Sequence, residues 1–256
     1  MIRASALRRL SPALAAPALA AALAFAPGQA AAEEGLSDAA REALRTEIRA
    51  YLLEHPEVVM EAIQELEKRR RVAQAEEEAQ VLAALRGELR DDGYSFVAGN
   101  PDGDVTVVEF LDYNCGYCKK AHEDVKAMLR MDGNIRYVIK EFPVLGESSV
   151  LAARAAMAAM MQGADYYEFH DAMMSHRGRL DMKTIERLAK ASDVDLAQMR
   201  EDMQSPEIKG KLERTYALAQ QLRIEGTPTF VIGDQLVRGF KPLKDLQDVV
   251  RAEREG

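Results

Sequence analysis

Two cysteines, Cys115 and Cys118, are the residues of this sequence whose type and spacing most clearly indicate chemistry. They form a C-x-x-C motif and are the only cysteines among 256 residues. A disulfide that closes so short a loop removes little entropy from the unfolded chain, so it contributes little stability. The pair is therefore predicted to react by exchanging thiols and disulfides, and not to act as a structural staple.

The segments on either side of the motif predict how the two sulfurs differ. A β-rich segment, Val105–Leu111, precedes the cysteines, and a helical pattern runs from them to about Arg130. Cys115 therefore falls at a helix N-terminus, where free backbone N–H groups and the helix dipole favour the thiolate over the thiol. Its pKa is expected below the free value of about 8.5. Cys118, one turn into the helix, is placed to resolve the mixed disulfide that Cys115 forms.

A metal site is the competing interpretation of the motif. His122 extends it to C-x-x-C-x-x-x-H, which supplies three ligands, but a closed zinc site needs a fourth, usually from a second knuckle. Because the chain has no other cysteine, we expect no metal. We expect no cofactor either, since no dinucleotide-binding or Walker motif is present. His122 is predicted to be an exposed helix residue, and His170 and His176 to be packing or surface residues.

Glu109 lies on the predicted strand, six residues before Cys115. Burial raises the pKa of a carboxyl group toward neutrality, so Glu109 could relay the proton that Cys118 must lose. Alternatively, Glu109 forms a structural ion pair with Lys140 on the next strand. The sequence leaves both possibilities open.

The elements that must position these residues form an α/β pattern. A turn signal at Gly99–Gly103 marks the predicted start of a domain covering residues 99–256. The order is strand, helix, strand, helical block, two strands and a closing helix. The predicted strands after the first are Ile135–Phe142, Thr229–Ile232 and Gln235–Arg238; the helical block covers residues 148–222, and Pro242 opens the last helix.

Residues 1–32 read as a secretory signal peptide. Three arginines precede an apolar stretch, Leu10–Phe25, and small residues lead to a cleavage site after Ala32. A membrane anchor is the alternative, but this stretch is short of the roughly 20 residues that a spanning helix needs. We expect export and removal of the peptide. The net charge of −8 and the absence of a basic stripe argue against a nucleic-acid partner.

Two helices are predicted after the signal peptide. Ser37 can cap the first, and His55-Pro56 breaks it and opens the second. Residues 33–66 carry an apolar stripe, predicted to mediate self-association; the alternative is packing on the catalytic domain. Residues 67–98 are predicted to form a charged helical linker whose first part, Glu67–Gln80, is a solvent-exposed spacer. The stripe consists of Leu44, Ile48, Tyr51, Leu52, Val59, Ile63 and Leu66.

Two stretches, Glu109–Lys119 and Gly226–Phe230, resemble the DsbA-like branch of the thioredoxin superfamily. This resemblance implies a thioredoxin fold whose two halves are separated by an inserted helical domain at about residues 148–222. It maps the family's cis-proline onto Pro228 and the residue before it onto Thr227. The resemblance implies that this turn lies against Cys115 and pairs with the backbone of a client protein.

Gly116-Tyr117 between the cysteines, with Thr before the proline, resembles the disulfide isomerase branch. Leu36–Leu66 resembles the N-terminal oligomerisation region of suppressor-of-copper-sensitivity proteins, which are ScsC-like. Together these resemblances imply a periplasmic isomerase or reductase that acts on exported, cysteine-containing proteins. They also imply a membrane thiol–disulfide exchange partner and a homo-oligomer, with a trimer favoured. The alternatives are a DsbA-like oxidase and a client-binding chaperone whose thiols tether substrates.

Overall fold

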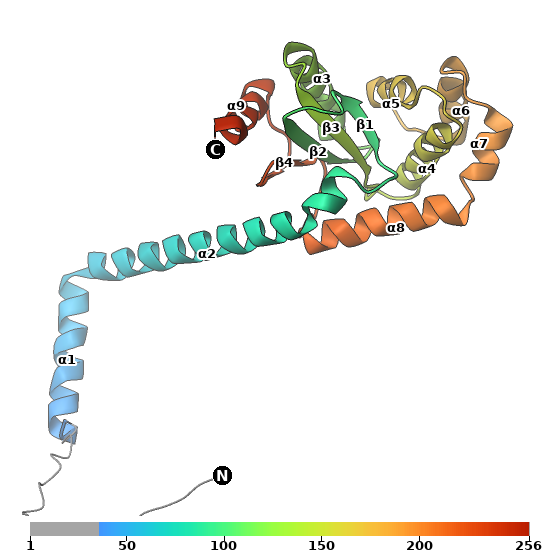
Figure 1. Cartoon of the computed structure of the whole chain (residues 1–256). Coiled ribbons are helices and arrows are strands. Elements are labelled where there is room, and N and C mark those ends of the chain that lie inside the picture. Colours follow the sequence, from blue (N-terminus) through green and yellow to red (C-terminus); the bar gives the residue numbers. More distant parts are fainter. Residues whose placement is uncertain (1–35, 256) are drawn as a thin grey trace, which may run out of the picture. The chain divides into compact units, whose positions relative to one another are not determined.

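The computed structural model describes residues 36–255, and Figure 1 shows its helices and strands. The predicted signal peptide lies outside these residues. By its internal contacts the chain divides into two units, one ending at Ala62 and the other beginning at Ile63. No helix among the described residues is both long and apolar enough to cross a membrane.

The first unit is helical, as predicted. α1 (Asp38–Glu54) begins after Ser37, whose side chain accepts the N–H of Ala40, and it ends at His55. α2 (Pro56–Arg90) then begins with proline, which has no N–H to leave unsatisfied in a first turn. The large apolar side chains of this unit that remain exposed are Leu36, Leu44, Ile48, Tyr51, Leu53, Val59 and Met60.

The second unit is built on a five-stranded sheet with the order β1-β3-β2-β4-β5. β2 and β3 pair in parallel, and the other neighbours are antiparallel. Because both faces of the sheet are covered, β2 is buried at six of its seven positions and β3 at all seven, including the charged residues Glu109, Lys140 and Glu141. The strands are β1 (Phe96–Gly99), β2 (Val105–Leu111), β3 (Ile135–Glu141), β4 (Thr229–Ile232) and β5 (Gln235–Arg238).

A helical insertion separates β3 from β4, which confirms the predicted α/β class and its inserted helical block. The side chains of Asp165, Asp181 and Ser205 each cap a helix of this insertion by accepting a backbone N–H. The insertion contains α4 (Glu147–Met161), α5 (Tyr166–Ser175), α6 (Met182–Ala191), α7 (Leu196–Asp202) and α8 (Pro206–Gln221); α3 (Gly116–Met131) precedes β3, and α9 (Leu243–Glu255) closes the chain.

The two faces of the sheet have different covers. Val107, Tyr137 and Phe230 share one cluster with the buried residues of α3, α4, α5 and α9. The opposite face, which carries Val108 and Val138, is covered by α8 and the C-terminal part of α2. These two helices lie on the same side of the sheet in Figure 1.

The C-terminal part of α2 docks on this face. Leu82, Leu85 and Leu89 are buried there against β2, β3, β4 and α8. The helix is continuous through the predicted spacer, which is exposed over most of its length. Near the end of that spacer, however, Glu77 and Glu78 form ion pairs with arginines of the catalytic unit. The predicted spacer is therefore solvent-exposed at every position except Glu78, and its last turn also forms ion pairs with the catalytic unit.

Candidate active site

The cysteines meet the turn before β4 at the N-terminus of α3. Cys115 is the N-cap residue of that helix, and 7% of its surface is exposed. Its Sγ lies 3.2 Å from the carbonyl oxygen of Thr227, to which the thiol donates. Cys118, one turn further, is completely buried. Both cysteines are free thiols, and the partly accessible one stands at the positive end of the helix.

The two thiols have opposite tendencies to ionise. A hydrogen bond from the Cys118 thiol, then one from the Thr227 side chain and the backbone N–H groups of Cys118 and Tyr117, lower the pKa of Cys115 to about 5. Burial, the hydrogen bond to Cys115 and the charge of Glu109 raise the pKa of Cys118 far above its ordinary value. Cys115 is therefore the thiol of the pair that ionises at neutral pH, and Cys118 holds its proton.

The turn that faces Cys115 contains a cis peptide bond between Thr227 and Pro228. Pro228 is buried, Thr227 is half-buried, and the turn leads directly into β4. The Pro228 carbonyl accepts the N–H of Gly239, which ties the turn to the end of β5. The Thr227 carbonyl accepts from the Cys115 thiol at the same place, so this backbone borders the reactive sulfur.

Glu109 is buried on the face of β2 that α3 covers. Tyr137 of β3 donates its hydroxyl proton to Oε2, and Oε1 has no hydrogen-bond partner among the described residues. Burial raises the pKa of this carboxyl to about 8 against the opposing effect of the Tyr137 hydrogen bond, and the nearby Cys115 thiolate adds to the increase. The group is thus close to Cys115 and titrates near neutrality.

The predicted pairing of Glu109 with Lys140 was wrong. Glu109 is opposite Ile139 in the parallel ladder, so the next residue, Lys140, points to the other face of the sheet. There its Nζ lies 2.5 Å from a carboxylate oxygen of Asp92 and donates to the Glu88 carbonyl at the end of α2.

Comparison with known proteins identifies the architecture that holds this site. A family model described as thioredoxin matches residues 91–252, which is more than half of the chain. The chain belongs to the thioredoxin family. A second model, described as the copper resistance protein ScsC N-terminal domain, matches residues 41–73. Together with the solved structures below, these matches place the chain among DsbA-like oxidoreductases close to ScsC.

Three similar proteins cover different parts of the chain. A thioredoxin-like oxidoreductase from Silicibacter pomeroyi DSS-3 is 44% identical with a TM-score of 0.65, and the match covers 67% of this chain and 98% of that one. A linker-deletion variant of Proteus mirabilis ScsC is 26% identical with a TM-score of 0.64, covering 88% and 99%. Na(+)/H(+) antiporter NhaA 3 of Salinispora tropica is 31% identical over 66% of this chain, which spans only 27% of that relative.

The prediction that His122 is exposed was wrong. Its side chain is 2% exposed, and Nε2 lies 2.7 Å from Asp171 of α5, because α5 covers this face of the thioredoxin-family catalytic helix. Burial lowers the pKa of His122, so the ring is neutral at neutral pH. His170 is completely buried beside it. Among residues 36–255 no three His, Cys, Asp or Glu side chains are grouped to hold a metal ion.

Lys119 is a site residue that the sequence analysis missed. Its Nζ donates to the carbonyl oxygens of Met173 and His176 at distances of 2.9 and 2.8 Å. The residue directly after Cys118 therefore ties the catalytic helix to the C-terminal end of α5. Nothing local signals this contact, because a lysine after a C-x-x-C motif has no characteristic partner in sequence.

An aromatic surface lies on the exposed side of the motif. Tyr117, between the cysteines, is 65% exposed and stacks on Phe240 with ring centroids 6.4 Å apart. Lys120 holds its Nζ 4.2 Å from the centroid of the Phe240 ring, a cation–π contact. Phe240 follows Gly239, whose N–H bonds to the Pro228 carbonyl. The aromatic surface therefore extends from the C-x-x-C motif to the Thr227–Pro228 turn of the thioredoxin-family site.

Proposed function

We propose that this thiol–disulfide oxidoreductase acts in the periplasm as a disulfide isomerase or reductase on exported proteins, through Cys115 and Cys118. The observation that carries the proposal is the Cys115 sulfur at the N-terminus of α3, with a pKa near 5 and a neighbouring backbone carbonyl at Thr227. A thiolate at neutral pH attacks disulfides, and an adjacent carbonyl can pair with an extended client chain.

The first step is attack of the Cys115 thiolate on a client disulfide. The client S–S bond breaks, a mixed disulfide forms, and one client sulfur leaves as a thiolate. In isomerisation, that thiolate attacks another client disulfide, and a further client thiolate then releases Cys115, so no net oxidation occurs. In reduction, Cys118 attacks the Cys115 sulfur, which yields a Cys115–Cys118 disulfide and a reduced client; a thiol-bearing membrane partner must then return two electrons.

Glu109 suits the proton transfer in the second route. The Cys115 thiolate helps to raise the pKa of Glu109, and that charge disappears once Cys115 is bound in the mixed disulfide. Glu109 therefore ionises more readily at the stage when Cys118 must lose its proton. We propose that the carboxylate accepts this proton, which favours attack by the otherwise protonated Cys118.

The N-terminal segment supports the isomerase branch of the proposal. Tyr51, Val59 and other apolar residues of α1 and α2 are exposed, and helices of this kind need packing partners to be stable. We propose that residues 33–66 form the hub of a homo-oligomer; the trimer rests on the resemblance to ScsC-like proteins. Several Cys115 thiolates held near one client raise the effective concentration for a second attack.

Trapping of mixed disulfides tests the assigned roles. Cys118→Ser should accumulate mixed disulfides with exported proteins on non-reducing gels, because the resolving sulfur is gone. Cys115→Ser is the matched control and should trap none. Equal trapping by both variants would contradict the proposal. In untreated cells, a reduced pair supports the isomerase or reductase, whereas an oxidised pair supports the alternative, a DsbA-like oxidase.

A further inference from the structure

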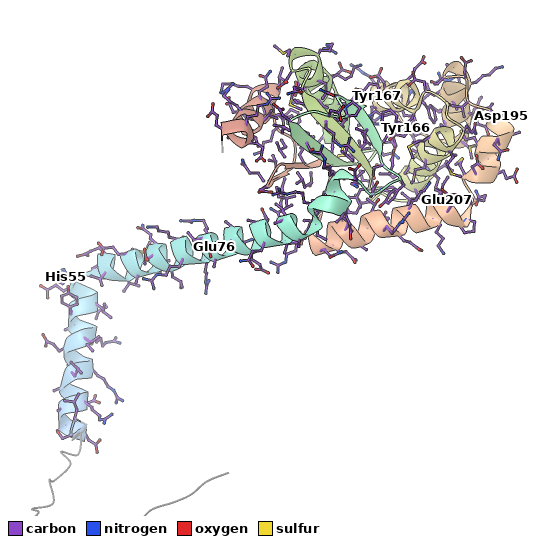
Figure 2. The ribbon with its side chains drawn as sticks, viewed as in Figure 1. His55, Glu76, Tyr166, Tyr167, Asp195 and Glu207 are labelled. Carbon is purple, nitrogen blue, oxygen red and sulfur yellow. The ribbon has the colours of Figure 1, made fainter. Side chains whose placement is uncertain are left out.

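A group of buried polar side chains lies directly under the loop that carries Cys115. Tyr113 comes from that loop, Glu141 from the end of β3, and Tyr166 and His170 from α5. All four are buried, and His170 is completely so. Tyr166, labelled in Figure 2, is the first residue of α5. Its ring stacks on that of Phe96 in β1. Residues from both halves of the catalytic unit thus converge here.

Hydrogen bonds join this group through Tyr113. Its hydroxyl donates to Oε1 of Glu141 at 2.8 Å and lies 2.9 Å from Nδ1 of His170. Because a phenol has one proton, the Nδ1 of His170 must carry the hydrogen that the Tyr113 oxygen accepts. Tyr166 donates to the same oxygen of Glu141 at 2.6 Å. Each of these donors then has one acceptor, whereas Oε2 of Glu141 and Nε2 of His170 have no hydrogen-bond partner among the described residues.

Asp112, which precedes Tyr113 in the chain, is also held by hydrogen bonds. The carboxylate of Asp112 accepts the N–H of Asn114 at 2.7 Å and those of Val144 and Leu145 at 2.8 and 3.0 Å. Asp112 thus fixes the loop to the segment that follows β3. Tyr113 is the residue that fixes it to α5, by way of His170, and it lies two positions before the reactive sulfur.

We propose that Tyr113 is a positioning residue for Cys115, and that Glu141 and His170 hold it in place. The helical insertion thereby determines where the attacking sulfur stands relative to the Thr227 turn. This proposal deepens the proposed function, since it assumes that Cys115 is the attacking thiolate. Burial keeps the imidazole of His170 neutral and raises the pKa of Glu141 to about 8, with Asp112 adding to the increase, so charge repulsion does not disturb the group at neutral pH.

The test compares four variants of the full chain. Tyr113→Phe removes the hydroxyl, and Glu141→Met removes the acceptor at similar volume. Glu141→Gln keeps an acceptor oxygen and serves as the rescue variant. Tyr166→Phe is the matched control, because it deletes an equally buried hydrogen bond to the same carboxyl. It also removes the 3.4 Å contact between the Tyr166 and Tyr113 hydroxyls, but it leaves Tyr113 bonded to Glu141 and His170. The readouts are the pKa of Cys115 from the pH dependence of its alkylation, the equilibrium with glutathione, and unfolding of both redox forms.

Loss of one ordered hydrogen bond should raise the Cys115 pKa by roughly 0.5 to 1 in Tyr113→Phe and Glu141→Met and move the glutathione equilibrium toward the disulfide by about threefold to tenfold. Glu141→Gln and Tyr166→Phe should stay within about twofold of the parent. A purely structural role would destabilise both redox forms equally and change neither the pKa of Cys115 nor the glutathione equilibrium. That result in Tyr113→Phe would overturn the proposal. Because these readouts need no client, failure of the proposed function would appear separately, in the trapping experiment.

Discussion

Glu109→Gln should have a higher free energy of unfolding than the parent protein, by a margin that grows as the pH rises. This is expected although the substitution removes a group proposed to act in the reaction. The pKa of this carboxyl is raised from 4.5 to about 8 in the folded chain, mainly by burial. Between these values the folded state binds a proton that the unfolded state has released. The parent protein therefore loses stability as the pH rises through this window, and Glu109→Gln does not.

The size of the effect follows from the width of the window. Within this window the free energy of unfolding of the parent falls by about 1.4 kcal/mol for each pH unit. Near pH 7 it is therefore about 3 kcal/mol lower than at pH 4. Glutamine keeps an oxygen for the Tyr137 hydroxyl, and any constant cost of its amide cancels in the comparison of the two pH values. Hence the stability difference between variant and parent should grow by about 3 kcal/mol from pH 4 to pH 7.

Urea unfolding of the reduced proteins at a series of pH values measures this difference. Glu76→Gln is the matched control, because Glu76 is exposed on α2 (Figure 2) and its replacement should leave the pH dependence unchanged. A constant difference between Glu109→Gln and the parent across the window would refute the argument that Glu109 is buried and protonated at neutral pH. The same variant should resolve mixed disulfides more slowly.

The remaining predictions concern Cys115 and the N-terminal helices. The alkylation rate of Cys115 should level off above about pH 6 and fall tenfold per pH unit below about pH 5, because only the thiolate reacts. Thr227→Val should raise the midpoint of this pH profile by roughly 0.5 to 1 pH unit without unfolding the chain. An unchanged midpoint would remove Thr227 from the mechanism. In light scattering, the chain without its signal peptide should be an oligomer and a chain beginning at Ala75 a folded monomer. A chain beginning at Leu89 should unfold more easily, since loss of Leu82 and Leu85 costs about 2–4 kcal/mol each. A monomeric longer chain, or an oligomeric Ala75 form, would exclude the proposed hub.

Elements with strong local signals could be predicted from the sequence. The boundaries of β2, β4 and β5 agree with the structure because β-rich runs end there at turn residues. Ser37 and Pro56 predicted their helix starts because capping depends on neighbouring residues. The Cys115 environment was also predictable, since a strand followed by a helix places the motif at a helix N-terminus.

The errors all involve partners that are distant in sequence. The short β1 has no independent signal and exists because it pairs with β3. His122 is buried by α5, and Lys140 meets Asp92 because of the pleat of β3. The group around Tyr113 could not be found at all, because a tyrosine before a C-x-x-C motif does not reveal that Glu141 and His170 fold beneath it.

The docking of α2 has a consequence for the order in which the protein folds. The helix is synthesised before its partners, since Arg86 bonds to Asp234, 148 positions later, and Glu78 bonds to Arg238, 160 positions later. The apolar residues of α2 are buried only after α8 and β4, which come later in the chain, have packed against them. Contacts of such long sequence separation form slowly, because the intervening chain must first be ordered. If residues 33–66 form the proposed hub, these N-terminal helices can associate with those of other copies before the second face of the sheet is covered.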